Sequence, residues 1–182
     1  MPNTMIPTPL REPPAPGKGP YAKLAVLVVE DTPHMAGLIC GILKSIGVGQ
    51  IHQARTGEKA LQMLAGHEIH IAIIDDLEPP LDGLAVVKTI RTAQADLPNA
   101  VPVVFVTERK LKSAIIEARD AGVTEILLKP FSAIQLIARL DAVLARPRPL
   151  VKSAGFVGPD RRRRSSAAQV ERRQGQGAPA AR

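Results

Sequence analysis

The sequence predicts an α/β fold in which helices cover both faces of a doubly wound parallel sheet. Over residues 23–145, short runs of Val, Ile and Leu alternate with segments that have the apolar spacing of amphipathic helices, a pattern typical of repeated strand and helix units. Apolar residues make up 45% of the 182 residues, but aromatic residues only 2%. An aliphatic core of this kind suits parallel strands that are buried on both faces.

Five strands are expected to alternate with five helices. The first strand is the run LAVLVV, which is short and β-rich, and the helix after it can begin near Pro33 because proline is tolerated in a first helical turn. The same pattern repeats with short connections, which predicts right-handed crossovers between parallel strands. The expected strands are residues 24–29, 50–54, 70–74, 101–106 and 124–128, and the expected helices are residues 35–46, 57–65, 84–91, 110–121 and 132–144.

The two flanking segments have a different composition from residues 23–145. Residues 1–22 contain seven prolines and are expected to form a disordered Pro-rich leader. Residues 146–182 hold ten Arg or Lys against two acids and are expected to form a basic disordered tail. The whole chain has a net charge of +7, so the first 145 residues sum to −1. Nucleic acid is therefore expected as a partner only through the tail.

Cysteine content and hydropathy exclude other classes of protein. The single cysteine, Cys40, cannot form an internal disulfide, which fits a reducing cytoplasm. The N-terminus has no uninterrupted apolar stretch of the secretory type. The longest apolar runs are about six residues, far below the roughly 20 that cross a bilayer. We therefore expect a cytoplasmic protein with no membrane partner.

Carboxylate, hydroxyl and ammonium groups follow the predicted strands. Glu30 and Asp31 come after the first strand, Asp75 after the third, Thr107 after the fourth and Lys129 after the fifth. In parallel α/β sheets these strand ends meet at one edge, where functional groups collect. Three carboxylates in one place repel one another unless a cation is present, and Mg²⁺ prefers such oxygen ligands. The set therefore suggests metal-assisted phosphoryl transfer to an aspartate.

The segment IIDDLEPPLDG resembles the phospho-acceptor segment of bacterial response-regulator receiver domains. In that family the acceptor Asp is followed by Pro four places later, Asp seven later and Gly eight later. Pro79, Asp82 and Gly83 satisfy all three offsets from Asp75, whereas from Asp76 only the proline offset is met, by Pro80. The segments VVEDTPHM, FVTE and LLKPF resemble the acidic pair, the switching hydroxyl and the phosphate-binding lysine of the same family.

The resemblance covers about residues 23–145 and implies a flavodoxin-like five-stranded sheet of order 2-1-3-4-5 with five helices. It implies a stand-alone, chemotaxis-regulator-like switch that is not an enzyme beyond its own phosphorylation and dephosphorylation. A histidine kinase or phosphotransfer protein would donate phosphate, a downstream protein would be the target, and a homodimer stays open. The implied site is Asp75 as phospho-acceptor, Thr107 and Lys129 as its partners, and Glu30, Asp31, Asp75 and the backbone carbonyl of Leu77 around Mg²⁺.

Several residues keep other interpretations open. Glu108 stands where a small residue is usual and Ile126 where an aromatic switch residue is usual, which favours a degenerate receiver that binds proteins without phosphorylation. A haloacid dehalogenase-like phosphohydrolase also uses an aspartate at a strand end, but it needs a second Asp two places after its nucleophile. This chain has Leu77 at that place, which argues against such an enzyme. Asp76 is expected to point away from the site, because consecutive strand residues face opposite sides. Asp82 is expected to cap the third helix.

Overall fold

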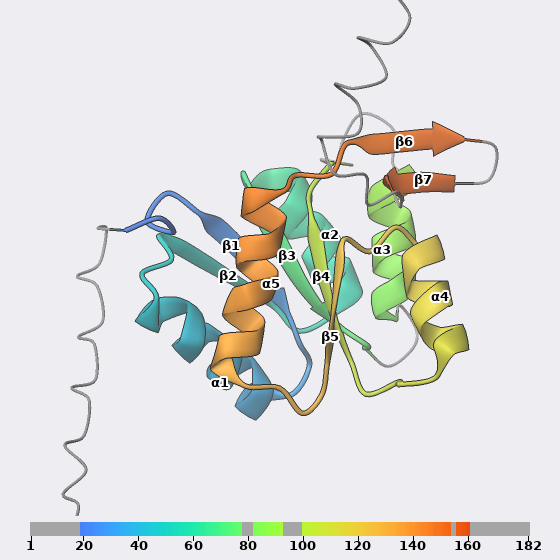
Figure 1. The fold of residues 1–182 in the computed structure, drawn as a ribbon. Helices are drawn as coiled ribbons and strands as arrows, with labels where there is room; N and C mark the ends of the chain where they lie inside the picture. Colours follow the sequence, from blue (N-terminus) through green and yellow to red (C-terminus); the bar gives the residue numbers. More distant parts are fainter. Residues whose placement is uncertain (1–18, 78–81, 93–99, 154–155, 161–182) are drawn as a thin grey trace, which may run out of the picture.

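The computed structural model describes residues 19–77, 82–92, 100–153 and 156–160. Its main sheet has five parallel strands in the order β2-β1-β3-β4-β5, which confirms the predicted doubly wound topology (Figure 1). The strands are β1 (Ala25–Val29), β2 (Gln50–Ala54), β3 (Ile71–Asp75), β4 (Val103–Thr107) and β5 (Glu125–Leu128).

Helices cover both faces of this sheet, as its aliphatic composition predicts. They are α1 (Pro33–Ser45), α2 (Gly57–Gly66), α3 (Gly83–Thr92), α4 (Lys112–Asp120) and α5 (Ala133–Ala145). The ends of all ten elements lie within two residues of their predicted positions. Helices α1 and α5 cover one face of the sheet, and α2, α3 and α4 cover the other (Figure 1). Their apolar side chains form one core cluster on each face. Within the described ranges, no helix combines the length and the hydropathy needed to cross a bilayer.

The central strand β1 shows how the core is divided between the two faces. Val26 and Val28 belong to the cluster under α1 and α5, whereas Leu27 and Val29 belong to the cluster under α2 and α3. This division follows from the alternation of side chains along a strand. Every residue of β1, β3 and β4 is buried, so the register of these strands is fixed by packing on both sides. The polar residues that follow them are held at one edge of the sheet.

A second sheet, outside the predicted fold, lies in the segment after α5. Strands β6 (Leu150–Ser153) and β7 (Phe156–Pro159) pair antiparallel, and β7 contacts α3 (Figure 1). The prediction that residues 146–182 are disordered is therefore wrong for this hairpin. A two-stranded hairpin is marginally stable alone, so its order depends on the domain surface beneath it, which the local sequence does not reveal. Residues 161–182 lie outside the described residues.

Glu125, at the amino-terminal end of β5, pairs with one arginine of α5 and with one in the connection that leads to the hairpin. Nη2 of Arg148 lies 2.8 Å from Oε1 of Glu125, and Nη1 of Arg139 lies 3.3 Å from its Oε2. A Cβ added to Gly158 would lie 2.9 Å from the Cα of Gly122, so the two backbones touch. A pocket of about 320 Å³ lies between the hairpin, α4, β5 and α5. It is at the opposite end of β5 from Lys129.

The predicted leader also has an ordered end. Residues 1–18 lie outside the described residues, but Tyr21 is partly buried and packs against the cluster under α1 and α5. Its hydroxyl donates a hydrogen bond to Oδ1 of Asp141 on α5 at 2.6 Å. The folded unit therefore begins a few residues before the predicted boundary at Lys23, because a single aromatic side chain anchors that segment.

Candidate functional site

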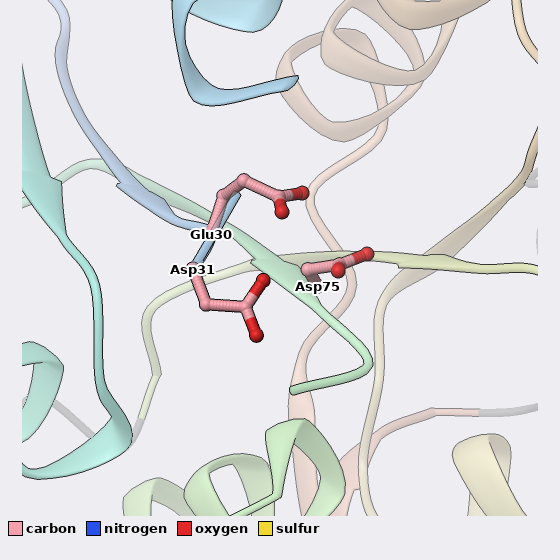
Figure 2. Close-up of side chains that lie close together, drawn as sticks. All are labelled: Glu30, Asp31 and Asp75. Carbon is pink, nitrogen blue, oxygen red and sulfur yellow. The ribbon is translucent and has the colours of Figure 1, made fainter. Parts of the chain in front are cut away.

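Three carboxylates meet where β1 and β3 end. Glu30 and Asp31 directly follow β1, and Asp75 is the last residue of β3 (Figure 2). One carboxylate oxygen from each lies within 4.8 Å of the others. Glu30 and Asp75 are 1% and 7% exposed, whereas Asp31 reaches solvent. The pairing of Val29 with Ile74 in adjacent parallel strands produces this arrangement, so the sheet register brings the predicted acids together.

The Glu30 carboxylate is only partly satisfied by the protein. Its Oε1 accepts a hydrogen bond from the backbone N–H of Thr32 at 3.0 Å. Its Oε2 is buried and accepts no hydrogen bond from any residue that the structure describes. Burial raises the pKa of Glu30, and the nearby charge of Asp75 raises it further. A buried carboxylate oxygen of this kind is a suitable acceptor for a cation or for water bound to one.

Lys129 brings an ammonium group to the acids from the end of β5. Its Nζ lies 2.7 Å from Oδ1 of Asp75 and 3.6 Å from Oε2 of Glu30. Its backbone N–H donates to the carbonyl of Thr107 at 2.9 Å, which continues the pairing of β4 with β5. Burial by itself would lower the pKa of Lys129, but its interactions with Asp75 and Glu30 outweigh burial and raise it. The ammonium therefore stays charged across the neutral range.

Thr107, the last residue of β4, is 3% exposed. Its hydroxyl donates a hydrogen bond to Oδ2 of Asp76 at 3.0 Å and accepts one from the backbone N–H of Arg109 at 3.0 Å. The prediction that Asp76 points elsewhere is therefore wrong. Asp75 pairs with Val106, so Asp76 and Thr107 occupy the next neighbouring positions, and neighbours across parallel strands share a face. Only the register reveals this contact.

The segment after the acids shows why a glycine begins α3. A Cβ on Gly83 would lie 2.0 Å from the carbonyl oxygen of Asp75 and 2.9 Å from the ring of Phe105. A side chain there would thus displace the backbone of Asp75. Asp82 accepts a hydrogen bond from the N–H of Ala85 through Oδ1 at 2.6 Å, which confirms that it caps α3.

The other residues singled out in the sequence differ in how far the structure buries them. Leu77 is 5% exposed and packs in the core, and its backbone carbonyl stays a predicted metal ligand. Glu108 is exposed. Ile126 is partly buried against the cluster under α2 and α3. Pro79 lies outside the described residues.

The donor set fits a divalent cation. Three carboxylates lie close together, and the two that are buried, Glu30 and Asp75, pair with the ammonium of Lys129. Acids at such distances repel one another, and the repulsion falls when a cation lies between them. The ligand atoms are carboxylate oxygens with solvent access on the side of Asp31, which suits Mg²⁺ because this ion keeps several waters and binds through one or two carboxylates.

Comparisons with known proteins agree with this arrangement. The family model of the response regulator receiver domain matches residues 26–141. The chemotaxis protein CheY-3 of Vibrio cholerae is 31% identical over 123 residues, which are 68% of this chain and 93% of that protein. The response regulator MprA of Mycobacterium avium is 32% identical over 126 residues, or 69% of this chain and 53% of MprA.

Solved structures show the same fold. A response regulator from Chloroflexus aurantiacus matches with a TM-score of 0.62 at 29% identity, covering 68% of this chain and 100% of that chain. The receiver domain of a sensor histidine kinase from Pseudomonas aeruginosa, solved with a magnesium ion coordinated in its active-site cleft, matches with a TM-score of 0.61 at 26% identity, covering 68% and 98%. From the matched family model, the relatives and the acid pocket together, the chain belongs to the response-regulator receiver family.

Proposed function

We propose that this chain accepts a phosphoryl group on Asp75, in the presence of Mg²⁺, from a histidine kinase or phosphotransfer protein. The phosphorylated form then signals through a protein-binding surface that phosphorylation alters. One observation supports this most directly. Asp75 is 7% exposed, lies 2.7 Å from the ammonium of Lys129, and has two further carboxylates within 4.8 Å.

The proposed reaction moves a phosphoryl group from a histidine nitrogen to an Asp75 carboxylate oxygen. The P–O bond to Asp75 forms as the P–N bond breaks, and the leaving imidazole keeps the electron pair and takes a proton from solvent. Lys129 is placed to offset negative charge on the phosphoryl oxygens, since it already pairs with Asp75. When bound, Mg²⁺ would offset the remaining charge between the carboxylates and the phosphoryl group.

The acidic residues proposed to hold the metal differ in their exposure to solvent. Asp31 reaches solvent and would bind the ion directly, together with Asp75 and the carbonyl of Leu77. Glu30 is 1% exposed, and its Oε2 already lies 3.6 Å from Lys129. It would therefore act through a metal-bound water rather than as a direct ligand.

The test is incubation of the full chain with acetyl phosphate and Mg²⁺, followed by intact mass measurement. We expect a gain of one phosphoryl group that disappears in Asp75→Asn and in the presence of EDTA. Asp82→Asn is a matched control, because Asp82 caps α3 through one oxygen and an amide can still accept that bond. A chain that folds and binds Mg²⁺ but gains no mass would instead be a degenerate receiver, a protein-binding module that works without phosphorylation.

A further inference from the structure

We propose that Asp76 is a positioning residue that restrains the hydroxyl of Thr107 and so opposes the phosphorylated state. This inference rests on the proposed phosphorylation of Asp75. Thr107 Oγ1 donates its hydrogen bond to Oδ2 of Asp76 at 3.0 Å. A hydroxyl has one proton to donate, so Thr107 can donate to a phosphoryl oxygen on Asp75 only after it releases Asp76.

The geometry makes this release a discrete step. Thr107 is 3% exposed, so water cannot freely replace either of its partners. Its oxygen also accepts a hydrogen bond from the N–H of Arg109 at 3.0 Å. The hydroxyl therefore has a carboxylate on its donor side and a backbone amide on its acceptor side. A hydrogen bond to a charged acceptor is stronger than one between neutral groups, which favours the restrained position.

Charge acts in the same direction. Once Thr107 turns toward a phosphoryl group, the Asp76 carboxylate loses its donor while a new negative group is attached to the adjacent residue. Asp76 is only partly exposed, so repulsion between the two anions is incompletely screened. Both effects depend on the carboxylate of Asp76, and both vanish if that side chain is shortened to a methyl group.

The neighbouring ion pair between Arg109 and Glu117 does not provide this restraint. Nη2 of Arg109 lies 2.8 Å from Oε2 of Glu117 on α4, but the two side chains are 50% and 46% exposed. Exposed pairs of this type contribute little to stability. Glu117→Gln is thus a matched control, since it removes a nearby carboxylate without touching Thr107.

The experiment measures the affinity of the full chain for beryllium trifluoride, a phosphoryl mimic, with Mg²⁺, and the rate of labelling by acetyl phosphate. We expect Asp76→Ala to raise both about tenfold, Asp76→Asn to give a smaller rise, and Glu117→Gln to change neither. In a Thr107→Val background, Asp76→Ala should raise the affinity much less, because there is no hydroxyl to release and only the repulsion between the two anions is removed.

The outcomes separate the two proposals. Equal affinity and labelling in wild type and Asp76→Ala would overturn the restraint while leaving Asp75 as acceptor. An Asp76→Ala effect that persists in full with Thr107→Val would also overturn it, because the effect would then not pass through the hydroxyl. If neither wild type nor Asp76→Ala is labelled or binds the mimic, the proposed function fails and this inference fails with it.

Discussion

The ammonium of Lys129 lies 2.7 Å from Oδ1 of Asp75 and 3.6 Å from Oε2 of Glu30, so one cation pairs with two buried acids. Glu30 directly follows the buried strand β1 and Asp75 ends the buried strand β3, so neither acid can move away from the other without disturbing the sheet. Removing one partner of a buried ion pair leaves an uncompensated charge. The stability of this fold is therefore linked to the charge balance of its site.

Replacement of Lys129 by Met is expected to destabilise the fold by about 3 kcal/mol without added metal, the lower end of the range for breaking a buried pair. Saturating Mg²⁺ should recover part of this loss, because the ion replaces the missing positive charge. Urea unfolding with and without Mg²⁺ measures both quantities. Lys88→Met is the control, because Lys88 is exposed on α3; an equal loss in that variant would contradict the argument.

Asp31→Asn should abolish Mg²⁺ binding while changing stability by less than about 0.5 kcal/mol. The side chain reaches solvent, and its hydrogen bond from the Thr32 hydroxyl at 3.1 Å can be kept by an amide oxygen. Calorimetric titration with Mg²⁺ checks the binding, and thermal unfolding checks the fold. Unchanged Mg²⁺ affinity in a folded variant would rule out Asp31 as a direct ligand.

Two glycines provide a matched pair of substitutions. Gly83→Ala should destabilise the chain by at least about 2 kcal/mol, because its Cβ would lie 2.0 Å from the carbonyl oxygen of Asp75. Gly41→Ala should stabilise it by roughly 0.5–1 kcal/mol, because Gly41 lies within α1 and nothing lies within 4 Å of the added carbon. Chemical denaturation of both variants tests the prediction. Similar values for the two would contradict the close approach at Gly83.

Tyr21 should titrate unusually late. Burial raises its pKa to about 12 from 10.0, helped by the hydrogen bond to Asp141 and the charge of Asp141. Below pH 10 the phenol is neutral in the folded and unfolded chain. Between pH 10 and 12 only the unfolded chain ionises, so this contribution to stability is lost as pH rises through that window.

The chain has one Tyr and no Trp, so phenolate absorbance reports Tyr21 alone. We expect little phenolate at pH 10 in the folded protein, and about half ionisation once the protein is unfolded in urea. Asp141→Asn should lower the midpoint without bringing it fully to 10, since burial remains. A folded protein that is half ionised at pH 10 would contradict the anchoring of Tyr21 on α5.

Two truncations should distinguish the contribution of the hairpin to stability from that of the arginine-rich segment after it. Deletion of residues 161–182 should leave stability unchanged, whereas deletion of residues 146–182 should lower it by roughly 1–3 kcal/mol, because Glu125, 9% exposed, loses Arg148 as a partner. Both should still be labelled at Asp75, since every proposed site residue precedes residue 146. Loss of labelling in a folded truncation would place part of the site in the tail.

Deletion of residues 161–182 also tests nucleic-acid binding. The segment from 161 to 164 is four consecutive arginines, and such clusters bind phosphates without sequence preference and with steep salt dependence. If the full chain binds DNA or RNA in a gel-shift assay, deletion of residues 161–182 should abolish that binding, and added salt should weaken it in the full chain. Binding that survives the deletion would assign it to the folded domain.

The sequence by itself determined the alternation of strands and helices and the residues at the strand ends. Apolar period and segment length are local properties of the chain, and the offsets of Asp82 and Gly83 from Asp75 can be counted along it. Parallel strands then place Glu30, Asp75 and Lys129 at one edge of the sheet by a general rule of α/β folds. For this reason the acid pocket was predictable residue by residue.

Three features became clear only from the tertiary structure. They are the side chain that accepts the hydrogen bond of the Thr107 hydroxyl, the reason for a glycine at position 83, and the surface on which the hairpin packs. The Asp76 contact depends on the register of β3 with β4, and a shift of one residue would reverse the faces. Gly83 is required by the backbone of Asp75, eight residues earlier. The hairpin packs against Gly122, and Arg148 just before it pairs with Glu125; two short strands need such a surface, which only the folded domain provides.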